Sequence, residues 1–182
     1  MAANTYTLIS SNVLASSAAS VTFSSIPATY TDLVLRLSTR GDNATIWNNY
    51  LRLKINATSA LSSITYIAGT GAAASSFTAS GIGSTGFYPI TNAAGSVMSN
   101  SAGNTASTFD NIEIYIPSYT ATQNKPLSTF GVAEQNATTA YIVAGAGLER
   151  TTAAITTLTL QQDAATNFVT GSSFYLYGIK NS

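Results

Sequence analysis

The side chains best suited to acid–base chemistry in this chain are its seven Asp and Glu residues, because the sequence contains neither His nor Cys. The absence of His and Cys removes the usual general base, the commonest metal ligand and the thiolate nucleophile. A glycosidase needs only two facing carboxylates, which separate strands can supply. Asp110 and Glu113 are close in sequence, but on a strand they fall on opposite faces. The spacing of the others selects no pair: Asp32, Asp42, Glu134, Glu149 and Asp163. The sequence therefore favours a protein with no catalytic residue, no metal site and no cofactor.

Four of the seven basic residues lie in two neighbouring segments, residues 31–40 and 50–56. They are Arg36, Arg40, Arg52 and Lys54. If the two segments pair as strands, all four cations project from one face of a sheet and would dock an acidic partner surface. The alternative is an ordinary solvated sheet face without a partner.

Tyrosine is the most frequent aromatic residue, with ten copies against one Trp. Tyr175 and Tyr177 share the face of a strand opposite to two apolar residues. Exposed tyrosines combine apolar area with a hydroxyl, which suits protein contacts or stacking on sugar rings. We therefore expect partner contacts at Tyr175 and Tyr177, and at Tyr6 and Leu8 in the first strand. The alternative is that at least half of the tyrosines pack in the core.

Four short motifs match known signals, and each has a simpler interpretation as a turn. Arg40-Gly41-Asp42 matches a cell-adhesion tripeptide, but Gly-Asp-Asn is also ordinary turn chemistry. Three Asn-Ala-Thr triplets, at 43–45, 56–58 and 136–138, have the form of glycosylation sites. We interpret all four motifs as turns.

The elements that must position these residues are β-strands, because apolar residues recur with a period of two. In residues 31–40 three leucines fall on one side of a two-residue period and Arg36, Ser38 and Arg40 on the other, and residues 50–56 repeat the pattern. Helical periodicity is nowhere sustained. We predict strands at residues 5–10, 20–24, 31–40, 50–56, 64–69, 109–116, 127–135, 139–144, 154–161 and 172–179, with further candidates at 75–80 and 86–90.

About ten strands separated by turns predict an all-β fold, an antiparallel β-sandwich that is jelly-roll-like. We expect residues 1–182 to form a single domain with an extended N-terminal segment of about residues 1–19. We expect the 31–40 strand to pair with the 50–56 strand. The last two predicted strands, 154–161 and 172–179, are expected to form a hairpin-like pair.

The segments between the predicted strands are rich in small and polar residues. Residues 69–86 and 91–107 are expected to be loops near the tip of the sandwich, although such long loops are unusual in a compact domain. Gly145-Ala146-Gly147 is expected to end a strand. Residues 118–126 are predicted to form a polar loop that carries Tyr119 and Lys125.

Charged residues make up only 8% of the chain, and seven positive side chains balance seven negative ones. Nucleic-acid binding by counterion release requires clustered cations, so we expect no nucleic-acid partner. No apolar run approaches the length of about 18 residues that spans a bilayer, and the first residues lack the features of a signal peptide. We therefore expect no membrane partner and synthesis in a cytoplasm. A near-neutral surface gives little repulsion between molecules, which suits a subunit of an assembly.

Three stretches of the chain carry a likeness to a known class of protein. They are SAASVTFSSIPATYTDLVL at 17–35, IEIYIPSY at 112–119 and SFYLYGI at 173–179. These stretches resemble virion structural proteins of tailed bacteriophages, especially those of cyanobacterial hosts. The resemblance runs from the first strand to the last, but residues 57–107 match no such stretch.

The resemblance implies a non-enzymatic structural protein of the virion, made in the host cytoplasm. Similar sequences look like capsid decoration (cement) proteins, and our first expectation is a homo-oligomer, with a trimer favoured, that bridges subunits of the major capsid protein or other virion proteins. The segment of about residues 1–19 would then reach along a neighbour. The alternative is a tail-fibre or tail-tip component that binds a host surface glycan through the loops 69–86 and 91–107 and exposed tyrosines.

Overall fold

The structure is a computed structural model, and it describes residues 5–44, 51–56, 63–69, 73–80, 99–134, 140–162 and 166–180. The described chain is all-β, as predicted, with eleven strands and no helix. The strands are β1 (Tyr6–Val13), β2 (Ser20–Phe23), β3 (Asp32–Ser38), β4 (Leu51–Ile55), β5 (Ser63–Gly69), β6 (Ala74–Ser80), β7 (Asn111–Ile116), β8 (Lys125–Glu134), β9 (Ala140–Glu149), β10 (Leu158–Gln162) and β11 (Ser173–Ile179).

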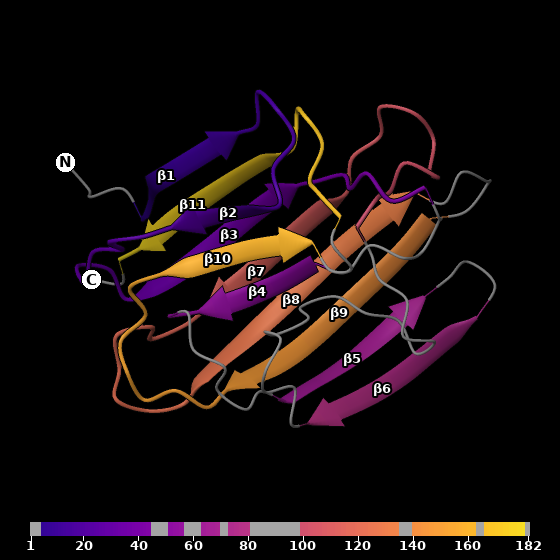
Figure 1. Cartoon of the computed structure of the whole chain (residues 1–182). Helices are drawn as coiled ribbons and strands as arrows, with labels where there is room; N and C mark the ends of the chain where they lie inside the picture. The colour runs from indigo at the N-terminus through magenta and orange to yellow at the C-terminus, as the bar shows by residue number, and fades with distance from the viewer. Residues whose placement is uncertain are drawn as a thin grey trace.

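The strands form two antiparallel sheets, which confirms the predicted β-sandwich. The large sheet has eight strands in the order β1-β11-β3-β7-β8-β9-β5-β6, and the small sheet has three in the order β2-β10-β4. In Figure 1 the small sheet lies in front of the part of the large sheet that contains β3 and β7. Residues of the large-sheet strands alternate between buried and less buried, so one face of this sheet packs on the core and the other faces outward.

The period-two alternation that predicts the strands also identifies the core. Leu33, Leu35 and Leu37 of β3 are at most 3% exposed. They belong to one apolar cluster that draws on both sheets. Its members include Ile112, Ile114, Ile116, Phe174 and Leu176 of the large sheet, and Val21, Phe23, Leu51, Leu53, Ile55, Leu158 and Leu160 of the small sheet. Burying each such side chain contributes about 1.5–3 kcal/mol, so apolar packing holds the two sheets together.

The predicted pairing of residues 31–40 with residues 50–56 is wrong. β3 pairs with β11 and β7, whereas β4 pairs with β10. The predicted pairing of residues 154–161 with residues 172–179 is also wrong, because β10 and β11 lie in different sheets. Apolar alternation identifies the buried face of a strand but not its neighbour, and here the chain crosses between the sheets.

The described part of the N-terminal segment, expected to extend over about residues 1–19, is held by its own domain. Strand β1 pairs with β11 at the edge of the large sheet. After β1, the backbone N–H of Leu14 donates to the carbonyl oxygen of Ser172 at 2.9 Å. Ala18 and Phe168 then exchange two backbone hydrogen bonds, of 2.8 and 3.0 Å. These residues are therefore not a free arm that reaches along a neighbour.

Strand β9 continues through Gly145-Ala146-Gly147, so the prediction that this sequence ends the strand is wrong. Gly145 pairs with Thr129 of β8 and with Tyr66 of β5. A β carbon on Gly145 would lie 2.7 Å from Thr129 Oγ1. The glycine is thus required by the close approach of a neighbouring side chain, a role that glycine often has inside strands.

Part of the predicted structure lies outside the described residues. This applies to residues 1–4, the strand candidate at 86–90, the triplet at 136–138, Asp163, the ends of the triplets at 43–45 and 56–58, and parts of the loops 69–86 and 91–107. Within those two loops, Ala74–Ser80 forms β6, which confirms the strand candidate at 75–80. Ser99, Asn100, Ser101 and Asn104 are buried, so this part of the second loop is not an exposed tip.

Candidate interaction surface

The four cations predicted to form one basic patch lie in three different places. Arg36 projects from the outer face of β3, away from the core, and its guanidinium contacts the Glu113 carboxylate on β7 at 2.5 Å. The two residues are register partners on neighbouring strands. Because both side chains are more than a third exposed, we expect their ion pair to contribute only about 0.2–1 kcal/mol.

Arg40 is buried, because the chain leaves the sheet after Ser38, where β3 ends. Its guanidinium donates to three backbone carbonyl oxygens of the 104–108 loop at 2.7–3.2 Å. The prediction of an outward-facing Arg40 is therefore wrong. Asp42 accepts two hydrogen bonds from Asn167, each of 2.9 Å. Arg40 and Gly41 are thus buried in a connection between strands, whereas Asp42 is exposed at the surface.

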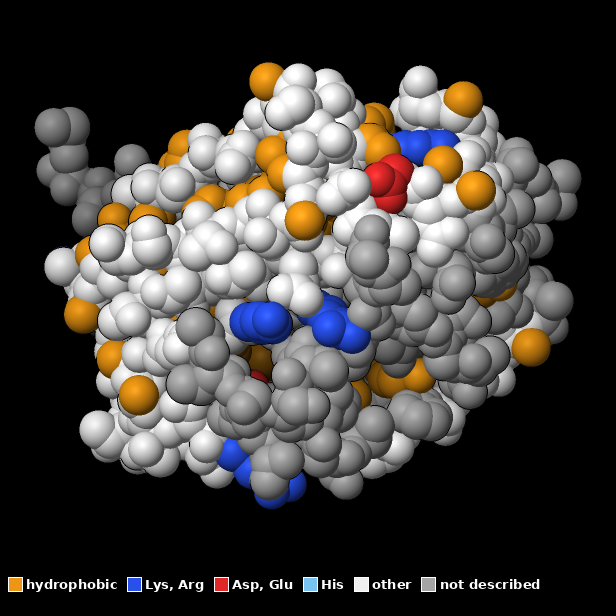
Figure 2. Space-filling model, in the orientation of Figure 1, with side chains coloured by type: hydrophobic (Ala, Val, Ile, Leu, Met, Phe, Trp, Pro, Cys, Tyr) orange, Lys and Arg blue, Asp and Glu red, His pale blue; other side chains and the backbone are white. Residues whose placement is uncertain are grey.

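Arg52 and Lys54 lie on β4, on the outer face of the small sheet, where Gln161 and Thr159 of β10 are their register partners. This face points away from the core and so to the opposite side of the sandwich from Arg36. Figure 2 views the side of the small sheet and shows a few separate Lys and Arg side chains within largely uncharged surface. The described structure therefore does not assemble the predicted basic patch.

Exposed apolar side chains gather instead on the outer face of the large sheet. Six large apolar residues of the described chain are between 46% and 63% exposed, and the strand registers place all six on this face. They are Tyr6, Leu8 and Val13 of β1, Ile67 of β5, Phe130 of β8 and Ile142 of β9. Tyr6 and Leu8 are among the residues that we predicted to contact a partner.

The strand registers align side chains in rows across this face. One row, from β1 to β6, reads Ser11, Tyr175, Arg36, Glu113, Phe130, Ala144, Ile67 and Ser76. The next row begins with Leu8, Tyr177, Val34, Tyr115, Ser128 and Ala146. Tyr175 and Tyr177 thus face outward, whereas Phe174 and Leu176 are buried, as the alternation predicts.

Tyrosine side chains on this face are held by specific contacts. The rings of Tyr6 and Tyr177 meet edge to face, with 6.4 Å between their centroids. Tyr115 Oη donates to Asp32 Oδ2 at 2.7 Å, and this hydrogen bond raises the pKa of Tyr115 to about 12. Asp32 also accepts a hydrogen bond of 2.8 Å from the backbone N–H of Ser118. The outer face therefore presents ordered aromatic groups.

A shallow apolar depression of about 240 Å³ lies on the large sheet where β5, β6 and β9 run together. It is lined by Ile67, Ala68, Gly69, Ala74, Ile142 and Ala144. None of these lining residues has a polar side chain to orient a small polar ligand, which specific ligand pockets normally supply. The depression suits an apolar side chain from a protein partner.

The described carboxylates for which contacts are resolved bind other protein groups. They are Asp32, Asp42, Asp110, Glu113 and Glu134. Asp110 is buried, and it accepts hydrogen bonds of 2.6 and 2.7 Å from the backbone N–H and hydroxyl of Thr39. Burial raises the pKa of Asp110 to about 7, although these hydrogen bonds act in the opposite direction. No group of three or more Asp or Glu residues that could hold a metal ion occurs among the described residues.

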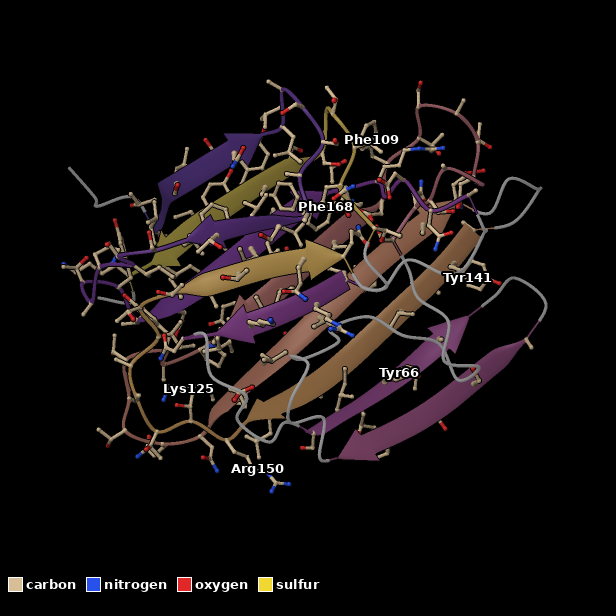
Figure 3. All side chains as sticks on the ribbon, in the orientation of Figure 1. Tyr66, Phe109, Lys125, Tyr141, Arg150 and Phe168 are labelled. Atoms are coloured by element: carbon tan, nitrogen blue, oxygen red, sulfur yellow. The ribbon has the colours of Figure 1, made fainter. Side chains whose placement is uncertain are left out.

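The predicted polar loop at 118–126 contains two deeply buried side chains. Lys125 is 1% exposed, and its Nζ donates to three backbone carbonyl oxygens at 2.5, 2.5 and 3.3 Å. Figure 3 places Lys125 where the loops before β8 and after β9 meet. Tyr119 is also buried, and its hydroxyl donates to the carbonyl oxygen of Pro27. Sequence composition gave no sign of these anchors, because polar residues surround both.

The exposed apolar residues beyond β1 were not predicted as contacts, although the sequence carries a signal for them. In β9, Ile142 lies between Tyr141 and Val143, so apolar residues occupy both phases of the strand. Phe130 of β8 and Ile67 of β5 likewise fall in the phase opposite to the core. A single apolar residue at an outward-facing position of a strand is common and needs no explanation. Several such residues on adjacent strands indicate an interaction surface.

Comparison with models of known protein families finds no match. No curated protein matches the sequence either. The resemblance to phage virion proteins therefore stays a prediction. Within the described residues, no helix is both long enough and apolar enough to cross a membrane.

Proposed function

We propose that this protein is a non-enzymatic structural subunit of a virion, and that it acts as a capsid decoration protein that stabilises the head. The observation that carries this proposal is the open outer face of the large sheet with its six exposed apolar residues. These residues form two groups, on β1 and on β8, β9 and β5, and apolar groups exposed on one sheet face mark a surface that a subunit of an assembly would bury. Its partners would be the major capsid protein, other virion proteins or further copies of itself.

Charge distribution supports the same function. The chain has no net charge, and the Arg36 and Glu113 side chains in the middle of the face neutralise each other. Apolar and aromatic groups around a paired charge resemble the core of a protein interface, in which charged residues are depleted and aromatic residues and Arg are enriched. Such a surface suits close packing of many copies on a shell.

The test is immunogold labelling of intact particles together with binding of the purified protein to heads that lack it. We expect label over the head and weaker head binding for Phe130→Ser, which truncates an exposed ring without opening the core. Lys54→Ser, on the opposite side of the sandwich, is the matched control and should bind like the unchanged protein. Label confined to the tail would contradict the decoration function.

A second candidate function, a tail-fibre or tail-tip component that binds a host glycan, is favoured by the ordered tyrosines of the same face. Tyr6 and Tyr177 present rings in fixed contact, and Tyr175 lies on the same strand as Tyr177. Aromatic faces of this kind can stack on sugar rings. This function predicts binding to host surface polysaccharide that Tyr177→Ala weakens at least several-fold. Unchanged binding by Tyr177→Ala, or no binding by the intact protein, would exclude the tyrosines as a glycan site.

A further inference from the structure

We propose that a second copy of this chain packs face to face on the outer face of the large sheet, about a two-fold axis that runs along the strands between β3 and β7. The inference rests on the proposed role as an assembly subunit and names a second copy as the partner of the same surface, so Phe130→Ser would weaken head binding through loss of the dimer. It differs from the expected trimer, because a two-fold axis makes this contact a closed dimer.

The rotation exchanges the strands on the two sides of the axis. It sets β3 over β7 of the second copy, β11 over β8 and β1 over β9, following the observed strand order. An axis parallel to the strands leaves each residue at the same level along them. Each row of side chains therefore meets the same row in reverse order, as an isologous contact requires.

The central row is self-complementary under this reversal. On one side of the axis it reads Arg36, Tyr175 and Ser11, moving outward, and on the other side Glu113, Phe130 and Ala144. Reversal places a cation against an anion, an aromatic ring against an aromatic ring, and a small residue against a small residue. The two Arg36–Glu113 pairs of the dimer then form one alternating group of four charges.

The neighbouring rows agree with the same axis. In one of them Val13 of β1 comes to lie opposite Ile142 of β9, and these two residues are 58% and 46% exposed in the single chain. In the row on the other side of the central one, Leu8 comes to lie opposite Ala146. Apolar side chains of β1 and β9 thus cover one another, which is the main favourable term in association, whereas Ile67 on β5 lies beyond the overlap.

The area of the overlap is sufficient for a stable dimer. Six strands at a spacing of about 4.8 Å, each with about seven residues of about 3.4 Å, offer on the order of 700 Å² per copy. The sum for both copies, about 1,400 Å², lies within the range of specific protein interfaces. Two sheets that pack at the usual distance of about 10 Å interdigitate their side chains, as the two sheets within this chain do.

Charge on the face permits this stacking. Besides Arg36 and Glu113, the described large-sheet residues directed to this side include Asp32 and Glu134, which lie at strand ends. Asp32 binds Tyr115 and Ser118, and Glu134 binds Thr105 in the adjoining loop. Two copies therefore meet through a neutral centre.

The experiment measures the mass of the full chain by sedimentation velocity over a wide range of concentration, for the unchanged protein and for Arg36→Glu and Glu113→Arg. Each single reversal puts like charges together at both symmetric contacts, so we expect each to weaken dimerisation by roughly tenfold or more. An equimolar mixture of the two variants has opposite charges at both contacts. The mixture should therefore form a heterodimer with at least the affinity of the unchanged dimer.

A mixture of Lys54→Glu with Glu113→Arg controls for attraction between whole molecules of opposite net charge. Lys54→Glu changes the net charge as Arg36→Glu does, but on the small sheet. Lys54→Glu alone should dimerise normally, and this mixture should pair more weakly than Arg36→Glu with Glu113→Arg. If both mixtures pair equally, attraction is not located at the proposed face and the inference is wrong.

The inference is also overturned if the unchanged chain stays monomeric at hundreds of micromolar, forms a trimer, or forms a dimer that neither single reversal weakens. The proposed virion function is tested separately from this inference. If intact particles carry no label but the protein forms a dimer that responds to the charge reversals as expected, the self-association surface is supported and the decoration function is contradicted. If heads are labelled but the purified protein is monomeric, the decoration function is supported and the self-association surface is contradicted.

Discussion

At the scale of single residues, the described structure is organised by polar side chains buried near the ends of the sheets. Asp110, Arg40 and Lys125 are each less than 10% exposed and bind backbone groups of loops or strand ends. Buried charges are tolerated only when hydrogen bonds replace their hydration. Their hydrogen bonds hold connecting segments that contain few buried apolar side chains.

Asp110→Asn should change how stability depends on pH. The pKa of Asp110 is about 7 in the folded chain against an ordinary value of 3.8, so the folded state holds an extra proton between these values. The favourable contribution of protonated Asp110 is complete below pH 4 and is lost as the pH rises through about 7. The free energy of unfolding should therefore fall by up to about 1.4 kcal/mol per pH unit in this window because of this group.

Urea unfolding at several pH values between 4 and 8 tests this prediction. Asn keeps the acceptor for the backbone N–H of Thr39 and is never charged, so the variant should be more stable than the unchanged protein at pH 8 and similar to it at pH 4. A constant difference between the two proteins over the whole range would show that Asp110 does not titrate in this window.

Lys125→Met should destabilise the fold by about 1–3 kcal/mol, because it leaves three backbone carbonyl oxygens without their donor in a buried place. Burial lowers the pKa of Lys125, and the carbonyl oxygens support its charged form. Arg150→Met is the matched control, since Arg150 is exposed close by and points away from the molecule (Figure 3). Thermal unfolding that is equal for both variants would contradict the anchoring role of Lys125.

At the scale of elements, contacts with side chains on the neighbouring strands decide which residues fit at a position within a strand. Strand β9 lies between β8 and β5, and its register brings Gly145 beside Thr129 and Tyr66. Composition alone treats Gly145-Ala146-Gly147 as a break, whereas the neighbours make it part of a ten-residue strand. The same pairing of neighbouring strands aligns side chains into the rows of the outer face.

Gly145→Val should destabilise the protein by about 1–3 kcal/mol, because its β carbon would lie 2.7 Å from Thr129 Oγ1, so that Thr129 or the strand must shift. Ala146→Val is the control in the same strand, since Ala146 faces outward and has room. Denaturant unfolding compares the two variants. Equal stability of both would mean that the strand can shift to admit the larger residue at 145.

At the scale of the whole molecule, two sheets of unequal size share one apolar core. The small sheet has only three strands, and Leu53 of β4 and Leu35 of β3 belong to the same buried cluster. The apolar face of the small sheet is removed from water by packing on the large sheet, and this burial stabilises both sheets. The large sheet covers that face with one side and keeps its other side open, which is the surface assigned here to a partner.

Leu53→Ala and Leu35→Ala should each lower stability by about 2–5 kcal/mol, because each empties a site that is at most 1% exposed. Since both sites lie in one core, each variant should still unfold in a single transition that includes both sheets. Calorimetry measures this through the agreement of the van't Hoff and calorimetric enthalpies. A separate early transition in Leu53→Ala would show that the small sheet unfolds by itself.

The candidate surface was predictable in part from particular residues. Tyr6, Leu8, Tyr175 and Tyr177 were expected to face a partner, and all four lie on the outer face of the large sheet. Their common face follows from the period of two within each strand. Arg40 failed as a prediction because alternation holds only while the chain stays in the sheet, and β3 ends at Ser38.

The sequence by itself determined the strands, their buried faces and the absence of net charge, because these depend on residue type and on a local period of two. Only the tertiary structure decided which strands are neighbours, since pairing joins segments far apart in the chain. Strand order separated Arg36 from Arg52 and set Arg36 beside Glu113. Strand order also placed Phe130 and the other outward-facing apolar residues on one face, and this surface cannot be recognised from any single strand.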